Sequence, residues 1–184
     1  MNSQLVSISK FLSLVLRHRP ERIGLALDAN GWANMDLLLN KAVQNANRII
    51  TREELLRVVA SDDKQRYSIS EDGLRIRANQ GHSVKGIDLQ LEPIEPPEEL
   101  FHGTVAKYLD SIRKQGLRKR QRHHVHLSLD RDTAIKVGQR RGTAVVLLVR
   151  TSEMHAAGYR FFLSANGVWL TDHVPAEFLD FPGE

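Results

Sequence analysis

The sequence predicts an α+β protein with two lobes, the first mainly helical and the second rich in strands. Apolar residues recur at helical spacing in the first sixty positions, whereas short alternating or β-branched runs dominate after residue 100. Between these regions, segment 93–99 holds three of the six prolines. Because proline continues neither a helix nor a central strand, we interpret 93–99 as a linker between lobes 1–92 and 100–184.

The first lobe is expected to contain three helices. Apolar spacing predicts the first over about residues 4–18 and the second over 35–43. The third begins at Thr51, because Thr51 followed by Glu54 forms a capping box, and it extends to about Val59.

A basic hairpin follows these helices. Segments 66–69 and 74–77 alternate with the strand period around the turn 71–73, and their basic residues project from the hairpin. Three helices followed by a basic hairpin are typical of a winged helix-turn-helix, an architecture that often binds nucleic acids.

The second lobe is expected to consist of strands with short helices. A helix is predicted over 107–115, where Gly116 stops it, and another is predicted to end near Val137 after a cap at Asp130 or Asp132. The expected strands are 100–104, 124–129, 144–149, 161–162 and 168–170. The β-branched run 144–149 is typical of a central strand buried on both faces, and the last two strands form a closing hairpin.

Composition limits the possible functions. The absence of cysteine excludes disulfides, thiolate metal sites and cysteine nucleophiles. No apolar run approaches the roughly 18–20 residues of a membrane span, and the first residues lack the pattern of a secretory signal. We therefore expect a cytoplasmic protein that does not interact with membranes.

Positive charge is concentrated in one segment. The net charge is +4, and six basic residues with no acid between them fall within ten positions, at Arg113, Lys114, Arg118, Lys119, Arg120 and Arg122. A phosphate-rich ligand suits this segment, although a solvated helix end and loop have the same composition.

Two short motifs could carry chemistry. Arg17 and His18 end the first helix, where they either bind phosphate or stabilise the negative end of the helix dipole. The motif His102-Gly103-Thr104 follows a strand, where its glycine allows close approach of a ribose or pyrophosphate; an ordinary turn is the alternative.

A metal site and the common phosphate loops are not expected. His123, His124 and His126 lie close in sequence, but the sequence places no further ligand beside them, so we predict no metal. The glycines of 138–142 have the wrong spacing for a P-loop or a dinucleotide-binding crevice.

Taken together, six segments resemble the KptA family of bacterial RNA 2′-phosphotransferases, relatives of the fungal tRNA 2′-phosphotransferase that completes tRNA splicing. The resemblance covers nearly the whole chain. Its segments are Ser9–Pro20, Asp63–Tyr67, Ile76–Ser83, Leu100–Thr104, Arg122–Ser128 and Asn166–Leu170.

The resemblance implies a winged-helix lobe joined to an ADP-ribosyltransferase-like lobe, with RNA and NAD meeting in the cleft between them. It also implies a reaction in two steps. The RNA 2′-phosphate attacks the nicotinamide ribose of NAD and expels nicotinamide. The ribose 2″-hydroxyl then attacks the phosphorus, releasing 2′-hydroxyl RNA and ADP-ribose 1″,2″-cyclic phosphate.

By similarity, Arg17, His18, Arg66 and Arg122 are the catalytic residues. Our hypothesis is that the first three hold the 2′-phosphate, that Arg122 orients NAD, and that His18 donates a proton to the departing RNA oxygen. The expected NAD contacts are His102, Gly103, Thr104, His126 and Ser128. Basic residues of the hairpin and of 113–120 would contact the RNA backbone.

Two other functions remain open at this point. An ADP-ribosyltransferase that modifies phosphorylated nucleic-acid ends or a protein would stop after the first step. A winged-helix regulator without catalysis would have no reason to combine Arg17, His18 and Arg66 with Arg122. The sequence implies no protein partner, and we expect a monomer.

Overall fold

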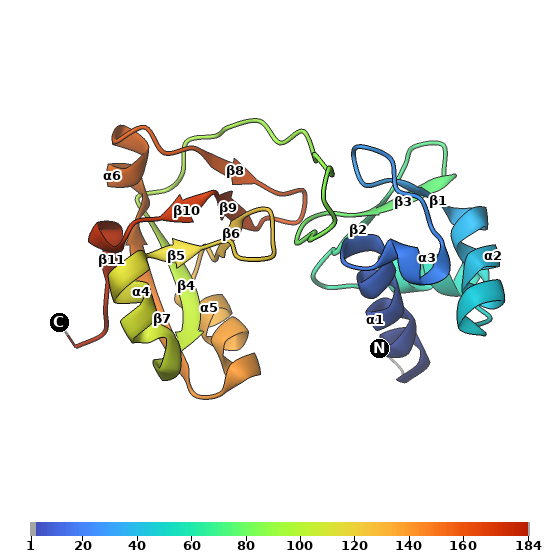
Figure 1. The fold of residues 1–184 in the computed structure, drawn as a ribbon, viewed down its shortest axis with the longest axis horizontal. Coiled ribbons are helices and arrows are strands. Elements are labelled where there is room, and N and C mark those ends of the chain that lie inside the picture. Colours follow the sequence, from blue (N-terminus) through green and yellow to red (C-terminus); the bar gives the residue numbers. More distant parts are fainter. Residues whose placement is uncertain (1–2, 184) are drawn as a thin grey trace. The chain divides into compact units, whose positions relative to one another are not determined.

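The computed structural model describes residues 3–183, and the chain divides into two compact units, one ending at Gln90 and the other beginning at Leu91 (Figure 1). The described residues form six α-helices and several small antiparallel sheets, which confirms the expected mixture of helices and strands. None of these helices combines the length and apolarity needed to cross a bilayer.

Unit 1 contains the three expected helices. Its elements are α1 (Ser3–Arg17), η1 (Pro20–Ile23), β1 (Ala33–Asn34), α2 (Met35–Ala46), α3 (Arg52–Ala60), β2 (Tyr67–Ile69) and β3 (Arg75–Ala78). The predicted capping box is confirmed, since Thr51 and Glu54 exchange both hydrogen bonds at the start of α3. The apolar faces of the helices meet in one core; its fully buried members include Leu12, Leu16, Leu38, Leu55 and Ile76.

The sheet of unit 1 has one strand more than expected. Strands β2 and β3 form the predicted antiparallel hairpin, and β1 pairs with the other edge of β3. Two residues are too few for an alternating pattern, so β1 could not be found from the sequence. Figure 1 shows β3 between its two neighbours.

Unit 2 is richer in strands, as expected. Its elements are β4 (Glu99–Val105), η2 (Ala106–Tyr108), α4 (Leu109–Gln115), β5 (Leu117–Arg118), β6 (Val125–Leu127), α5 (Arg131–Gly138), η3 (Gln139–Arg141), β7 (Ala144–Arg150), α6 (Thr151–Ala156), β8 (Phe161–Leu163), β9 (Trp169–Thr171), β10 (His173–Val174), η4 (Ala176–Phe178) and β11 (Leu179–Asp180). Of the two caps considered for α5, Asp130 is the one used, because its carboxylate accepts from the Thr133 N–H at 2.7 Å.

Three small sheets build unit 2. Strand β7 is the centre of the order β11-β7-β4, as its apolar sequence predicted, while β8 and β9 form the predicted closing hairpin beside β6. Strand β10 pairs with β5. Phe101 and Ser128 exchange backbone hydrogen bonds at 2.8 and 2.9 Å, which joins β4 to the chain that leaves β6.

The proline-rich segment belongs to unit 2. Pro93 forms a bridge to Phe162, and the Ile94 N–H donates to the Phe161 carbonyl at 2.9 Å. Glu99 already belongs to β4. The division of the chain therefore comes before the prolines, because backbone groups of that segment find partners on the edge of β8.

Gly103 is required by the packing of α5 on β4. A Cβ at this position would overlap the Ala134 carbonyl oxygen and lie 2.9 Å from the Gly138 nitrogen. Both atoms are backbone of α5, so neither can rotate away. The glycine thus lets the helix lie directly on the strand, a reason for its presence that is independent of ligand binding.

Candidate functional site

In unit 1, the end of α1 lies beside the start of β2. Nη2 of Arg17 lies 3.4 Å from the Arg66 carbonyl oxygen, and the Arg17 guanidinium lies 5.9 Å from the Tyr67 ring centroid. The Tyr67 hydroxyl donates to the Ser9 carbonyl at 2.6 Å, and burial raises the pKa of Tyr67, so it remains a neutral phenol. Arg17 and Arg66 are therefore brought together by tertiary structure.

Arg66 is held by a buried carboxylate. Asp62 is 4% exposed, and its side chain accepts from the Arg66 guanidinium and, at 2.7 Å, from the Arg66 backbone N–H. A pair of this kind limits the positions that the arginine can take. Asp62 therefore acts as the support that orients Arg66.

His18 is fixed by Ser83, which follows β3. The His18 Nδ1 and the Ser83 Oγ lie 3.0 Å apart, and the Ser83 N–H donates to the Arg17 carbonyl at 2.8 Å. Ser83 therefore contacts both the last carbonyl of α1 and the imidazole of His18. Because Nδ1 is engaged, Nε2 is the nitrogen directed elsewhere.

Unit 2 holds the second group of predicted residues. The His102 Nδ1 lies 3.1 Å from the His126 carbonyl, and the His126 Nδ1 lies 3.1 Å from the His124 carbonyl. A carbonyl only accepts, so each Nδ1 carries the proton. Burial is the main cause that lowers the pKa of His102, and its neutral ring presents Nε2 as an acceptor.

Arginines gather near the same strand. The pKa of Arg122 is lowered, first by partial burial and then by the charges of Arg141 and Arg140, and Arg141 also contributes to the lowered pKa of His102. Arg140 and Arg141 belong to η3, which packs on β4. Because the charges of Arg140 and Arg141 disfavour the charged form of Arg122, an anionic ligand at this place would relieve the repulsion among the three cations.

The other predicted contacts of unit 2 also fall on or beside β4. Gly103 and Thr104 follow His102 on the strand, where Thr104 is buried, and Ser128 pairs with Phe101. The residues cited for NAD thus lie on neighbouring elements. Their contacts with NAD, and the joint action of Arg122 with the three residues of unit 1, stay predictions.

Comparison with known proteins identifies the family. A family model described as "RNA 2'-phosphotransferase, Tpt1 / KptA family" matches residues 3–173. The chain belongs to this family. A protein of Agrobacterium fabrum named "Probable RNA 2'-phosphotransferase" is 57% identical over 172 residues, covering 93% of this chain and 91% of that protein. Proteins of the same name from Rhodopirellula baltica and Flavobacterium johnsoniae are each 53% identical, covering 98% and 95% of both chains, respectively.

Membership of the Tpt1 / KptA family agrees with the resemblance found in the sequence. Within residues 3–183, no three histidine, aspartate or glutamate side chains gather in a group that could hold a metal ion.

Several residues that contact the predicted site residues or shift their pKa values were not predicted from the sequence. Asp62 stands four positions before Arg66, a spacing that could have suggested their pairing. Ser83 gave no such signal, because it is 65 residues from His18. Arg140 and Arg141 were considered only as part of a phosphate loop, although their relevance comes from their place beside Arg122.

The lowered pKa of His102 predicts acid sensitivity of unit 2. Below the ordinary histidine pKa of 6.5, His102 binds a proton in the unfolded chain but stays neutral in the folded state. The free energy of unfolding therefore falls as pH decreases. The loss begins near pH 6.5 and ends below the folded-state pKa. Thermal unfolding at pH 7.5 and 5.5 should show a smaller pH dependence for His102→Gln than for the wild type; an unchanged dependence would contradict this assignment.

Proposed function

We propose that this chain is an NAD-dependent RNA 2′-phosphotransferase. The observation that supports it best is the grouping of Arg17, His18 and Arg66 at the end of α1, in a chain whose family model covers residues 3–173. Two guanidiniums and an imidazole match the charge and geometry of one phosphate dianion. The supports from Asp62 and Ser83 hold these donors in place before the substrate arrives.

Unit 1 would bind the RNA 2′-phosphate. Arg17 and Arg66 would neutralise the dianion and direct one phosphate oxygen at the anomeric carbon of the nicotinamide ribose. The new P–O–C bond forms as the bond to nicotinamide breaks, and nicotinamide leaves with the electron pair. Arginine suits this role because its planar fork contacts two oxygens at once.

The residues of unit 2 fit NAD as a co-substrate. The neutral His102 offers an Nε2 acceptor to a ribose hydroxyl, and Arg122, Arg140 and Arg141 offer positive charge to the diphosphate. NAD supplies the ADP-ribosyl group that carries the phosphate away. The remaining expected contacts are Gly103, Thr104, His126 and Ser128.

The second step needs charge compensation and a proton. The ribose 2″-hydroxyl attacks the phosphorus, the bond from phosphorus to the RNA 2′-oxygen breaks, and the hydroxyl proton is balanced by one delivered to that oxygen. Arg122 would offset the charge that grows on phosphorus, and His18 would deliver the proton through Nε2.

We also propose that unit 1 belongs to the winged-helix class and unit 2 to the ADP-ribosyltransferase-like class. Three helices with the sheet order β1-β3-β2 support the first assignment, and the small sheets around β7 and β9 support the second. The basic residues of 113–120 would then contact the RNA backbone.

The decisive test is product analysis. A short RNA with one internal 2′-phosphate is incubated with the protein and NAD, and the RNA and nucleotide products are resolved by mass. The proposal expects phosphate-free RNA, nicotinamide and ADP-ribose cyclic phosphate in equal amounts. A persistent ADP-ribosylated RNA would instead indicate a transferase that stops after the first step, and no NAD consumption would overturn both enzyme assignments.

Arg141→Ala should weaken binding of ADP-ribose by at least about tenfold, because a charged hydrogen bond contributes roughly 1.5–3 kcal/mol. Isothermal titration calorimetry measures this without turnover. Arg131→Ala, which removes an exposed charge from the first turn of α5, is the matched control and should change the affinity by less than about twofold. Equal losses in both variants would mean that only net charge matters.

Ser83→Ala should lower kcat for phosphate removal by about fivefold to tenfold while leaving the affinity for ADP-ribose unchanged. The variant loses the contact that orients His18, worth about 1 kcal/mol, but keeps the backbone bond to Arg17. Ser83→Thr keeps a hydroxyl and should recover most of the rate. A wild-type rate and pH profile in Ser83→Ala would rule out this positioning role.

A further inference from the structure

The central strand of unit 1 carries two arginines on its outer face. Ile76 and Ala78 are fully buried, so Arg75 and Arg77 project from the opposite face of β3. The register pairs Ala33 with Ile76, and one further step places Trp32 beside Arg77. The outer face of this sheet therefore presents two guanidiniums and one indole.

Trp32 holds both arginines. The Arg77 guanidinium carbon lies 4.6 Å from the indole centroid and that of Arg75 lies 5.4 Å from it, both within the range of cation–π attraction. Two like charges two residues apart on one strand repel each other, and the shared indole offsets part of that repulsion. We call the group formed by these three side chains the Arg75–Trp32–Arg77 platform.

The hydrogen-bonding capacity of the platform is largely unused. Arg75 has one acid nearby, Asp28 at 3.9 Å, and both side chains are about half exposed, at 48% and 46%. Within residues 3–183, the Arg77 side chain makes no hydrogen bond or ion pair, and its Nε is buried without a partner. The described part of the chain supplies no acceptor to this guanidinium, and its terminal nitrogens are not among the buried atoms, so these terminal N–H groups can donate to an anionic ligand.

The tip of the hairpin has the opposite charge. Glu71 and Asp72 lie at the turn, and hydrogen bonds from Ser70 and Leu74 lower the pKa of Asp72, so its carboxylate stays charged. A phosphate backbone is repelled there and attracted to the platform. The strand face is therefore the part of the hairpin suited to a polyanion.

We propose that the Arg75–Trp32–Arg77 platform binds single-stranded RNA that flanks the phosphorylated nucleotide. The guanidiniums would contact backbone phosphates and their planes would stack on a base, a combination that an acidic peptide cannot exploit because it has no π face. The inference rests on the proposed function for its choice of RNA, and it adds a binding site separate from the residues that hold the 2′-phosphate.

The test is RNA binding without catalysis. Fluorescence anisotropy follows a labelled 12-nucleotide single strand that lacks a 2′-phosphate, with the full chain and its variants. For Arg75→Ala/Arg77→Ala the Kd should rise at least tenfold, and the slope of log affinity against log salt should decrease by about 1 to 1.5, since each phosphate contact on a single strand contributes roughly 0.7.

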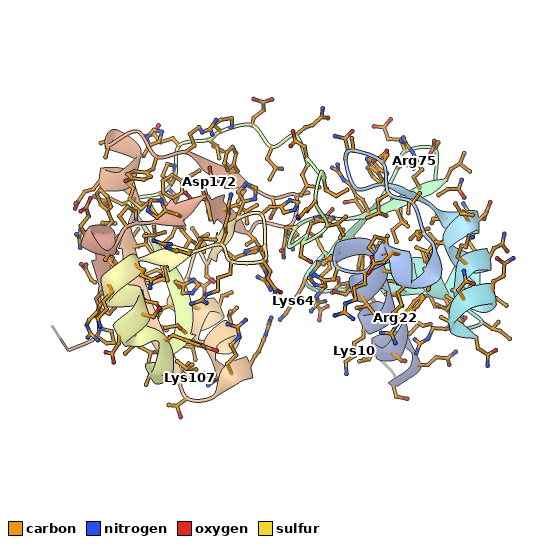
Figure 2. The ribbon with its side chains drawn as sticks, in the orientation of Figure 1. Lys10, Arg22, Lys64, Arg75, Lys107 and Asp172 are labelled. Carbon is orange, nitrogen blue, oxygen red and sulfur yellow. The ribbon has the colours of Figure 1, made fainter. Side chains whose placement is uncertain are left out.

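A control variant removes the same charge elsewhere on unit 1. Lys10→Ala/Arg57→Ala takes two exposed cations from α1 and α3, and Figure 2 places Lys10 at the edge of the unit away from Arg75. We expect its Kd to change by less than about twofold and its turnover to equal that of the wild type. Equal losses in the two double variants would overturn the platform.

Two more measurements keep the outcome decisive. If Arg75→Ala/Arg77→Ala fails to fold, Arg75→Lys/Arg77→Lys replaces it, because lysine retains the charge but cannot stack as a planar group. This variant should keep the slope of log affinity against log salt and bind RNA more weakly. An unchanged affinity would overturn the proposal. A poly-glutamate peptide that binds as tightly as RNA, with the same dependence on Arg75 and Arg77, would overturn the choice of ligand. Wild-type turnover of a 2′-phosphorylated dinucleotide separately tests the proposed function, because anisotropy does not depend on it.

Discussion

Arg66→Ala is expected to lower kcat/KM for removal of the RNA 2′-phosphate by a factor of about 10² to 10³. The variant removes a donor aimed at the phosphate, and removal of one preorganised donor typically has an effect of this size. It also leaves the Asp62 carboxylate without its main counter-charge at 4% exposure, where it repels the substrate. Binding of ADP-ribose should be unchanged, because its expected contacts lie in unit 2.

Loss of activity must be separated from loss of stability in this variant. We expect Arg66→Ala to lower the free energy of unfolding by about 2 kcal/mol, less than for a fully buried pair because the Arg66 side chain is 31% exposed. Asp62→Asn/Arg66→Ala removes the unpaired charge and should recover most of that stability without recovering activity. Arg57→Ala, which breaks an exposed pair with Glu53, is the surface control. A double variant that regains activity would show that Arg66 acts only through Asp62.

Gly103→Ala is expected to lower the free energy of unfolding of unit 2 by at least about 3 kcal/mol. The added methyl group would overlap the Ala134 carbonyl, and since the nearest atoms are all backbone of α5, no side-chain rotation relieves the overlap and α5 must move away from β4. Such a shift also displaces His102, Thr104 and η3, so binding of ADP-ribose should weaken in the fraction that still folds.

A second glycine provides the comparison. Gly158 has a φ of +92° and no atom within 4 Å of its missing Cβ, so Gly158→Ala introduces backbone strain of about 1 kcal/mol but no overlap. Urea unfolding followed by the fluorescence of Trp169, buried in the core of unit 2, measures both variants after Trp32→Phe removes the other indole. Equal losses for the two glycines would mean that α5 adjusts freely.

Much of the fold follows from local signals. Short sequence patterns predict the capping box at Thr51, the hairpin around 71–73 and the apolar strand β7. The structure contains all three. The elements that escaped prediction are short: they include α6 with six residues, and β1, β5, β10 and β11 with two residues each. An alternating pattern cannot be recognised over two residues. Strands β1 and β11 form because the longer β3 and β7 offer them hydrogen bonds, whereas β5 and β10 pair with each other.

The candidate site divides in the same way. The order and types of the side chains are enough to identify the family, to predict the chemistry and to find the residues able to bind phosphate. The residues that support this site, in contrast, are found only once the chain is folded. Ser83 reaches His18 across 65 positions, and Gly103 proves to be needed by α5. Contacts between residues distant in the chain arise from packing, which leaves no periodic trace in the sequence.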